Sequence, residues 1–114
     1  MIFKYSDVWI YPDGREVIQT KTLAGRGLMQ QRRWKAWDDS RGICCLCDRY
    51  ISIWSATLEH KTSKGSGGSK RDDRQSNLGI SHLGGNVAKG SMSLERYRRL
   101  PLATRIANCG SGAL

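Results

Sequence analysis

Three of the four cysteines lie within four consecutive positions, at Cys44, Cys45 and Cys47, and the fourth is Cys109. The chain has 114 residues, of which 39% are hydrophobic, so it can form one small domain with a modest apolar core. A core of this size often needs an additional cross-link to be stable. Cysteines crowded in this way are more typical of a metal site than of a disulfide framework. The sequence therefore predicts a single domain that carries a metal site.

The charge of the chain points to a polyanionic partner. The formal net charge is +9, and it is unevenly distributed. Residues 61–114 carry ten Lys or Arg against three Asp or Glu, whereas residues 1–60 carry nine against seven. A solvated basic surface that aids solubility is the alternative interpretation, but so lopsided an excess favours nucleic acid.

No membrane partner is expected. No apolar run approaches the ~20 residues that a membrane-spanning helix needs. The first residues, MIFKYSDVW, lack the basic and apolar regions of a signal peptide. We therefore expect a cytoplasmic location, where thiols remain reduced.

The pattern of apolar and turn residues predicts an α+β fold. Strands are expected in a hairpin over 5–18 that turns at Pro12-Asp13-Gly14, in a second hairpin with arms 50–54 and 56–60, and at 77–81. Helices are expected over about 28–39, after Gly25 and Gly27, and from 83–85 to about Leu100, where Pro101 ends the helix. Residues 61–76 read as a loop and residues 101–114 as a tail.

Four polar residues, Glu59, His60, Asn77 and Asn86, fall where these elements meet, so their side chains can converge. Phosphodiester hydrolysis needs a base to deprotonate water, which an imidazole can supply. It also needs positive charge at the phosphate, which a divalent ion held by oxygen ligands can supply. Adjacent residues of a regular strand point to opposite faces. Glu59 and His60 can therefore flank one phosphate only if the strand ends there and the backbone turns.

These residues resemble the pattern of the HNH endonuclease family. Glu59-His60 matches the acidic-His pair that ends the first strand in that family, and Asn77-Leu78 matches the "NL" that follows a loop. Asn86, with Lys89-Gly90 behind it, matches the "[H/N]xxKG" of the following helix. The upstream pair Cys44 and Cys47 is similar to the CxxC knuckle of many members. The resemblance covers about 44–91, and four fragments in the right order make it fairly specific.

The resemblance implies a ββα-metal core over residues 44–100, preceded by a hairpin and a lead-in helix over 1–43. It also implies metal-dependent cleavage of DNA, most readily double-stranded, by a nuclease of phage or mobile-element type in a bacterial or phage-infected cell. By the same resemblance His60 is the general base, Glu59 and Asn86 hold Mg²⁺ or Mn²⁺, and Asn77 braces the loop that orients His60. The residues expected to bind phosphates are Lys70, Arg71, Arg74, Lys89, Arg96, Arg98 and Arg99.

The chain departs from the family pattern in its metal ligands. The acidic position holds Glu59, where Asp is commoner, and the third signature position holds Asn86, whose carbonyl oxygen favours Mg²⁺ or Mn²⁺. The second half of the zinc knuckle reads His82 and Gly85, and glycine cannot ligate. Cys44, Cys47 and His82 thus supply three of the four ligands that structural zinc normally has. The alternatives are a fourth ligand from Cys109, a pairing shifted by Cys45, or no zinc.

Other interpretations of the same residues remain open at this stage. Glu59 could pair with Lys61 or an arginine, Asn86 could cap a helix, and Asn77 could be a turn residue. The alternative function is a non-catalytic DNA-binding module of the same fold, or a phage packaging accessory with a protein partner. A zinc-ribbon-like structural module is a third hypothesis.

Overall fold

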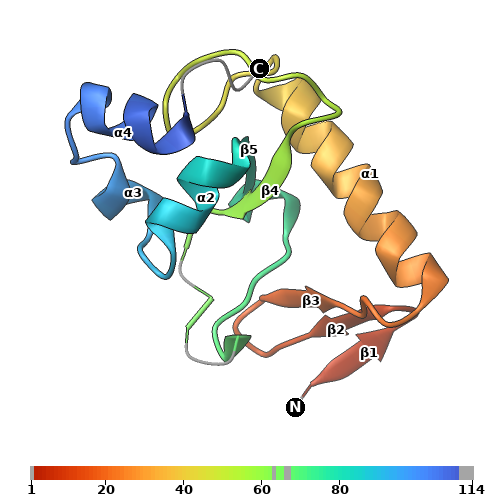
Figure 1. Cartoon of the computed structure of the whole chain (residues 1–114). Helices are drawn as coiled ribbons and strands as arrows, with labels where there is room; N and C mark the ends of the chain where they lie inside the picture. The colour runs from red at the N-terminus through yellow and green to blue at the C-terminus, as the bar shows by residue number, and fades with distance from the viewer. Residues whose placement is uncertain (1, 63, 66–67, 111–114) are drawn as a thin grey trace.

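The computed structural model describes residues 2–62, 64–65 and 68–110, which form two small antiparallel sheets and four α-helices (Figure 1). The α+β class is as expected. The strands are β1 (Phe3–Tyr5), β2 (Val8–Ile10), β3 (Glu16–Ile18), β4 (Thr57–His60) and β5 (Leu78–Ser81). The helices are α1 (Leu23–Asp39), α2 (Leu83–Lys89), α3 (Leu94–Tyr97) and α4 (Leu102–Cys109), and the short 3₁₀ helix η2 covers Gln75–Asn77.

The expected N-terminal hairpin is present and gains one strand. β2 pairs with β3 around a tight turn in which Gly14 has a φ of +91°, and β1 adds to the other edge of β2. Val8 and Ile18, which are opposite each other in the register, are buried. Figure 1 shows α1 running from this sheet along the molecule to the β4–β5 pair. The helix therefore connects the N-terminal sheet to the rest of the domain.

Helix α1 begins at Leu23, five residues before the expected start at 28, so the prediction of its N-terminus was wrong. The side chain of Thr22 caps the helix by accepting a hydrogen bond from the Gly25 N–H at 3.0 Å. Gly25 lies inside the helix, and a Cβ at this position would collide with the carbonyl oxygen of Gln19. A close backbone approach selects glycine here, and the residue does not break the helix.

The second hairpin was predicted with the wrong partner strand. Residues 50–54 form no strand, and their one ladder contact is an isolated bridge between Tyr50 and Ile43. β4 pairs instead with β5, with Glu59 opposite Gly79 and His60 opposite Leu78. Two segments separated by the loop at 61–77 therefore lie side by side, and α2 follows β5 directly.

The single helix expected to reach Leu100 is divided in two. α2 ends where Gly90 adopts a φ of +54°, and α3 begins anew where Ser93 accepts a hydrogen bond from the Arg96 N–H at 3.2 Å. Residues 102–109, which were expected to be part of a tail, form α4 against α2. Residues 111–114 of that tail lie outside the described residues.

The apolar core lies between α1, the β4–β5 pair and the C-terminal helices. Its fully buried residues include Leu46, Ile51, Ile80 and Tyr97. Cysteines contribute an unusual share, since Cys44, Cys47 and Cys109 are also buried there. Among the described residues, no helix is both long and apolar enough to span a bilayer.

Candidate functional site

A cavity of about 200 Å³ lies where β4 ends against α2, and Glu59, His60 and Asn86 all line it. Glu59 and His60 are the last two residues of β4, and both border this cavity. Asn86 holds the helix on the strand, since its Nδ2 donates to the Leu58 carbonyl oxygen at 3.1 Å. Three of the four residues assigned to the nuclease chemistry are thus brought together.

Glu59 is buried in an ion pair with Lys89. The two side chains are each 3% exposed, and Glu59 Oε1 lies 2.7 Å from Lys89 Nζ. The ammonium also donates to the His60 carbonyl oxygen at 3.2 Å, while the Ser81 hydroxyl donates to Glu59 Oε2 at 3.4 Å. The partner of Glu59 is therefore neither Lys61 nor an arginine. The partner is Lys89, which was predicted from the sequence to bind phosphate.

His60 is held by Asp73, which sequence reasoning missed. Its Nε2 lies 2.7 Å from Asp73 Oδ1, and that carboxylate is fully buried. Burial alone would raise the pKa of Asp73, but hydrogen bonds from His60, Arg71 and the Ile18 N–H lower it below its ordinary value. The carboxylate is therefore a suitable acceptor for the Nε2–H, and the neutral tautomer that donates this hydrogen bond has its lone pair on Nδ1.

Asn77 braces the backbone just beyond His60. Its Oδ1 accepts hydrogen bonds from the Thr62 N–H at 3.1 Å and from the Thr62 hydroxyl at 3.2 Å. Its Nδ2 donates to the Asp72 carbonyl oxygen at 2.8 Å, next to the carboxylate that holds His60. Asn77 is buried in η2, immediately before β5. It therefore ties together the two segments on which His60 depends.

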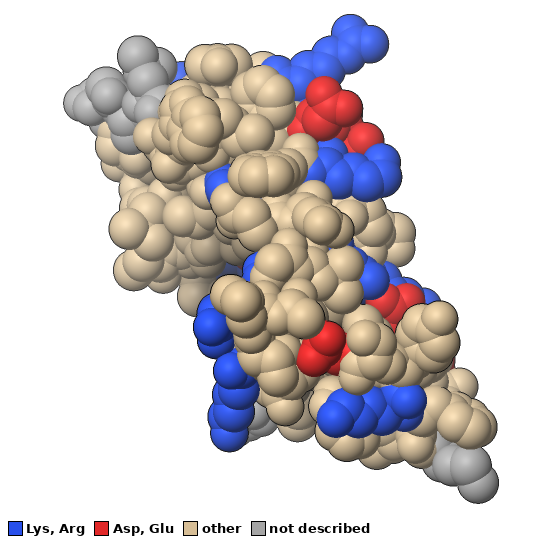
Figure 2. Space-filling model, turned by 90° about the vertical axis from the view of Figure 1, so that its right-hand side faces the viewer, with Lys and Arg blue, Asp and Glu red and all other residues tan. Residues whose placement is uncertain are grey.

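Most of the basic residues expected to bind phosphates are engaged in ion pairs. The pairs are Lys89–Glu59, Arg71–Asp73, Arg74–Asp72, Arg98–Asp48 and Arg99–Glu95. Lys70 and Arg96 are exposed and have no acidic partner in the described part of the chain. Figure 2 shows Lys and Arg scattered over one face, several of them beside Asp or Glu, without a continuous basic band. Lys64, absent from the sequence-based set, lines the cavity itself.

A second group of metal-ligating side chains lies near the N-terminal end of α2, which His82 precedes. The ligand atoms of Cys44, Cys47, His82 and Cys109 all lie within 4.8 Å of one another, and all four residues are buried. The Sγ atoms of Cys44 and Cys109 are 3.9 Å apart, and Cys47 Sγ is 3.4 Å from His82 Nδ1. Tetrahedral zinc with usual bond lengths would require about 3.8 Å and about 3.6 Å. This group could hold a metal ion such as zinc.

Cys109 reaches the group because position 85 is a glycine. A Cβ on Gly85 would lie 2.5 Å from Cys109 Sγ and 3.0 Å from a methyl carbon of Leu46. A Cβ on the neighbouring Gly84 would lie 2.6 Å from the carbonyl oxygen of Asn108, so α4 packs directly on the backbone of α2. The thiol of Cys109 thus occupies the space that a side chain at position 85 would fill. Of the alternatives for the fourth ligand, this geometry favours Cys109.

The electrostatics of the four ligands suit a cation. Burial raises the pKa of Cys44 and Cys109, because a buried thiolate is unfavourable without a compensating positive charge. Burial opposes ionisation at Cys47 as well, but hydrogen bonds from Arg49 and from the thiols of Cys44 and Cys109 together lower its pKa below the ordinary value. A bound metal ion would stabilise all three thiolates.

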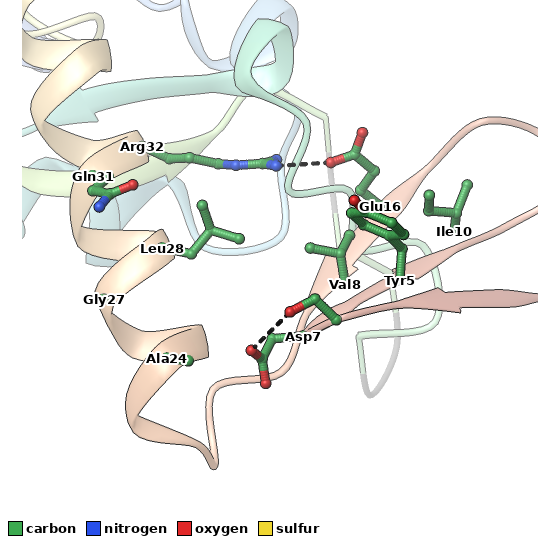
Figure 3. A pocket seen from close by; sticks show the side chains of 11 residues that line it. Tyr5, Asp7, Val8, Ile10, Glu16, Ala24, Gly27, Leu28, Gln31 and Arg32 are labelled. Atoms are coloured by element: carbon green, nitrogen blue, oxygen red, sulfur yellow. Dashed lines mark hydrogen bonds and ion pairs between the residues drawn. The ribbon is translucent and has the colours of Figure 1, made fainter.

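A larger cavity, of about 690 Å³, lies between the N-terminal sheet and α1 (Figure 3). It is lined by apolar groups such as Val8 and Leu28, and Arg32 forms an ion pair with Glu16 beside it at 2.9 Å. Asp7 at the other end accepts a hydrogen bond from the Thr22 hydroxyl at 2.9 Å. These polar groups already have partners, and the cavity brings no base and metal ligand together.

Comparisons of the chain with family models, with curated proteins and with solved structures gave no match. Function must therefore be inferred from the cavity beside β4 and from the cysteine–histidine group. The two lie on opposite ends of α2, with Asn86 contributed by the helix to the first and His82 preceding the helix in the second.

Proposed function

We propose that the chain is a metal-dependent endonuclease that hydrolyses phosphodiester bonds in DNA through an HNH-like ββα-metal core. The observation that carries this proposal is that Glu59, His60 and Asn86 line one cavity, with His60 oriented by a buried carboxylate. The antiparallel pair β4–β5, followed directly by α2, supports this proposal.

In this proposal His60 is the general base. The Asp73 carboxylate accepts the Nε2–H, which fixes the tautomer and the orientation of the ring. Nδ1 is then the atom that takes a proton from the attacking water. Asn77 keeps the segment after His60 in place through its hydrogen bonds to Thr62. The family resemblance assigned these two residues to the same roles.

Glu59 and Asn86 fit a hard divalent ion such as Mg²⁺ or Mn²⁺. Glu59 offers a carboxylate, and the Asn86 amide nitrogen is engaged with Leu58, which leaves its carbonyl oxygen as the ligating atom. Few protein oxygens are needed, because Mg²⁺ usually keeps several waters or phosphate oxygens in its shell. Such an ion, when bound, would neutralise charge on the scissile phosphate and on the leaving oxygen.

The cysteine–histidine group is proposed to hold structural zinc. Three thiolates and one imidazole form a closed tetrahedral set, which leaves no position for a substrate. The ion would join the knuckle at 44–47 to α2 and α4. Its contribution is therefore to stability rather than to chemistry.

The proposal is tested with supercoiled plasmid DNA in the presence of MgCl₂ or MnCl₂. We expect the wild-type protein to cut, and we expect His60→Ala to lose roughly 100-fold or more in rate while it still binds DNA. Glu59→Gln should also be inactive, and Glu95→Gln is its matched control because Glu95 is an exposed carboxylate paired with Arg99. Intact plasmid with either ion, together with retained DNA binding, would favour the non-catalytic DNA-binding or packaging-accessory module instead.

A further inference from the structure

We propose that Lys89 is a built-in counter-ion for Glu59, which occupies the cation position of the cavity and lowers the affinity of the site for a divalent metal. This inference rests on the proposed role of Glu59 as a metal ligand. It assigns to Lys89 a role other than binding phosphate.

The contacts of Lys89 place it within the metal site rather than on the surface. Its Nζ is 2.7 Å from Glu59 Oε1 and 3.2 Å from the His60 carbonyl oxygen. It follows Asn86 by three positions in α2, so the two residues share one face of the helix and line the same cavity. The ammonium therefore lies among the residues proposed to bind the metal and the attacking water.

Because Glu59 and Lys89 are both buried, each depends on the other for charge compensation. Both side chains are 3% exposed, and a buried charge of either sign needs a partner. Among the described residues, Lys89 is the one cation in an ion pair with Glu59. Lys64 lines the same cavity but is exposed, and Lys61 donates instead to the Ser76 carbonyl oxygen at 3.3 Å. Lys89 thus gives the Glu59 carboxylate an ionic partner that does not depend on any metal.

A divalent ion and an ammonium compete for the same carboxylate. Glu59 Oε1 is engaged by Lys89, while the one contact of Oε2 among the described residues is a long one to the Ser81 hydroxyl at 3.4 Å. An entering metal must either displace Lys89 or tolerate a like charge a few ångströms away. In both cases Lys89 weakens metal binding, and its removal leaves a buried carboxylate for which a metal is the best replacement partner.

The test measures metal binding directly. The whole chain, loaded with zinc, is dialysed without chelator and titrated with MnCl₂, and binding is followed by calorimetry and by the electron paramagnetic resonance of free Mn²⁺. We expect Lys89→Met to bind Mn²⁺ at least 10-fold more tightly than the wild type. We also expect its melting temperature to be lowered without Mn²⁺ and raised by Mn²⁺ more than that of the wild type.

Three control variants isolate the effect. Lys64→Met removes a cation from the same cavity without touching Glu59, so its Kd for Mn²⁺ should stay within threefold of the wild-type value. Lys89→Arg keeps the charge and should also stay close to the wild type. The double variant Glu59→Gln/Lys89→Met should lose the gain in affinity, because the carboxylate is gone.

The outcomes separate this inference from the proposed function. If Lys89→Met binds Mn²⁺ no more tightly than the wild type, whereas Glu59→Gln weakens binding, the counter-ion role is wrong and the metal site stands. If no variant binds Mn²⁺ and Glu59→Gln changes nothing, both proposals fail.

If Lys89→Met is unfolded without metal, Mn²⁺ should fold it. Should it stay unfolded, the same comparison of Kd values is made with Lys89→Gln, and an unchanged Kd rejects the counter-ion role.

Discussion

Asp73 shows how much one buried side chain can determine in this domain. Its carboxylate holds His60, receives the guanidinium of Arg71 at 2.8 Å and accepts a hydrogen bond from the Ile18 N–H at 2.8 Å. A candidate catalytic imidazole is therefore connected through one residue to the N-terminal sheet. In the sequence Asp73 is one of two adjacent aspartates in a charged loop, and nothing in its neighbourhood distinguishes it from Asp72.

We expect Asp73→Asn to reduce DNA cleavage by about 100-fold, because the amide can no longer hold the His60 tautomer by its charge. DNA binding at the same salt concentration should be nearly unchanged. Asp39→Asn is the matched control, since that carboxylate is exposed and forms a surface ion pair with Lys35 on α1. Equal loss of activity in both variants would remove Asp73 from the positioning role.

Asp73 should also make stability dependent on pH. Its pKa is lowered in the folded protein, so its contribution is complete above the unfolded-state pKa of ~3.9 and is lost as pH falls through the folded-state pKa. The free energy of unfolding should therefore drop for the wild type below about pH 4. Chemical denaturation of the wild type and Asp73→Asn between pH 7 and 3 should show the difference between them shrinking at the acidic end.

At the scale of secondary-structure elements, glycines allow close contacts between a helix and a neighbouring segment. Gly25 lets the start of α1 touch the backbone at Gln19, and Gly85 makes room for the thiol of Cys109. Sequence reasoning treated Gly25 as a break and Gly85 as a missing ligand. Both interpretations followed from local propensity alone, and the deciding contacts come from residues that only the fold brings near.

Gly85→Ala should destabilise the protein by about 1–3 kcal/mol, because its methyl group would overlap Cys109 Sγ. Gly27→Ala is the matched control, since a methyl group at that position of α1 would meet no atom within 4 Å apart from its chain neighbours and the backbone of the helix itself. This change should be neutral or stabilising by up to ~1 kcal/mol. Urea denaturation measures both. A Cys109→Ala change should reduce the penalty of Gly85→Ala if the thiol is its cause.

Cys109→Ser should lower the zinc content of the purified protein well below one equivalent, because three protein ligands rarely close a structural site. Cys45→Ser should leave the zinc content unchanged, since Cys45 is not part of the four-residue group. Elemental analysis of both variants decides the point. Equal zinc content in the two variants would exclude Cys109 as the fourth ligand.

The sequence predicted the central elements better than their surroundings. β4 and β5 and the convergence of Glu59, His60 and Asn86 followed from polar residues placed at the ends of apolar segments. The prediction that residues 50–54 pair with β4 was wrong. This segment is rich in apolar residues because Ile51 packs in the core, where its carbonyl oxygen accepts a hydrogen bond from the Trp37 indole. α4 was missed because its burial depends on contact with α2.

Across the whole molecule, the net charge of +9 overstates the positive surface that is free to meet DNA. Five of the seven basic residues assigned to phosphate binding form ion pairs with acidic residues, and some of these acidic residues are buried. Of those seven, Lys70 and Arg96 are exposed and have no acidic partner among the described residues. Lys64 lines the cavity itself, and Lys70 lines a neighbouring pocket that shares Thr62 with it. A short path of phosphate contacts next to the cavity fits this distribution better than a broad basic face.

DNA affinity should fall with salt, and Lys64→Ala and Lys70→Ala should each lower the slope of log K against log salt by about one. Lys35→Ala should leave that slope unchanged, because Lys35 pairs with Asp39 on α1 away from the cavity. Binding isotherms between 50 and 300 mM NaCl, roughly the range over which such contacts are measurable, test this. An equal slope for all three variants would exclude the loop as the binding path.

The placement of Cys109 opposite Gly85 also has a consequence for biosynthesis. Three of the four side chains that could surround a metal ion precede residue 83, and the fourth is 65 residues beyond Cys44. During translation, the incomplete set can hold an ion only loosely until α4 has left the ribosome. The domain would then acquire its metal, and with it the packing of α4 on α2, at the last step of its folding.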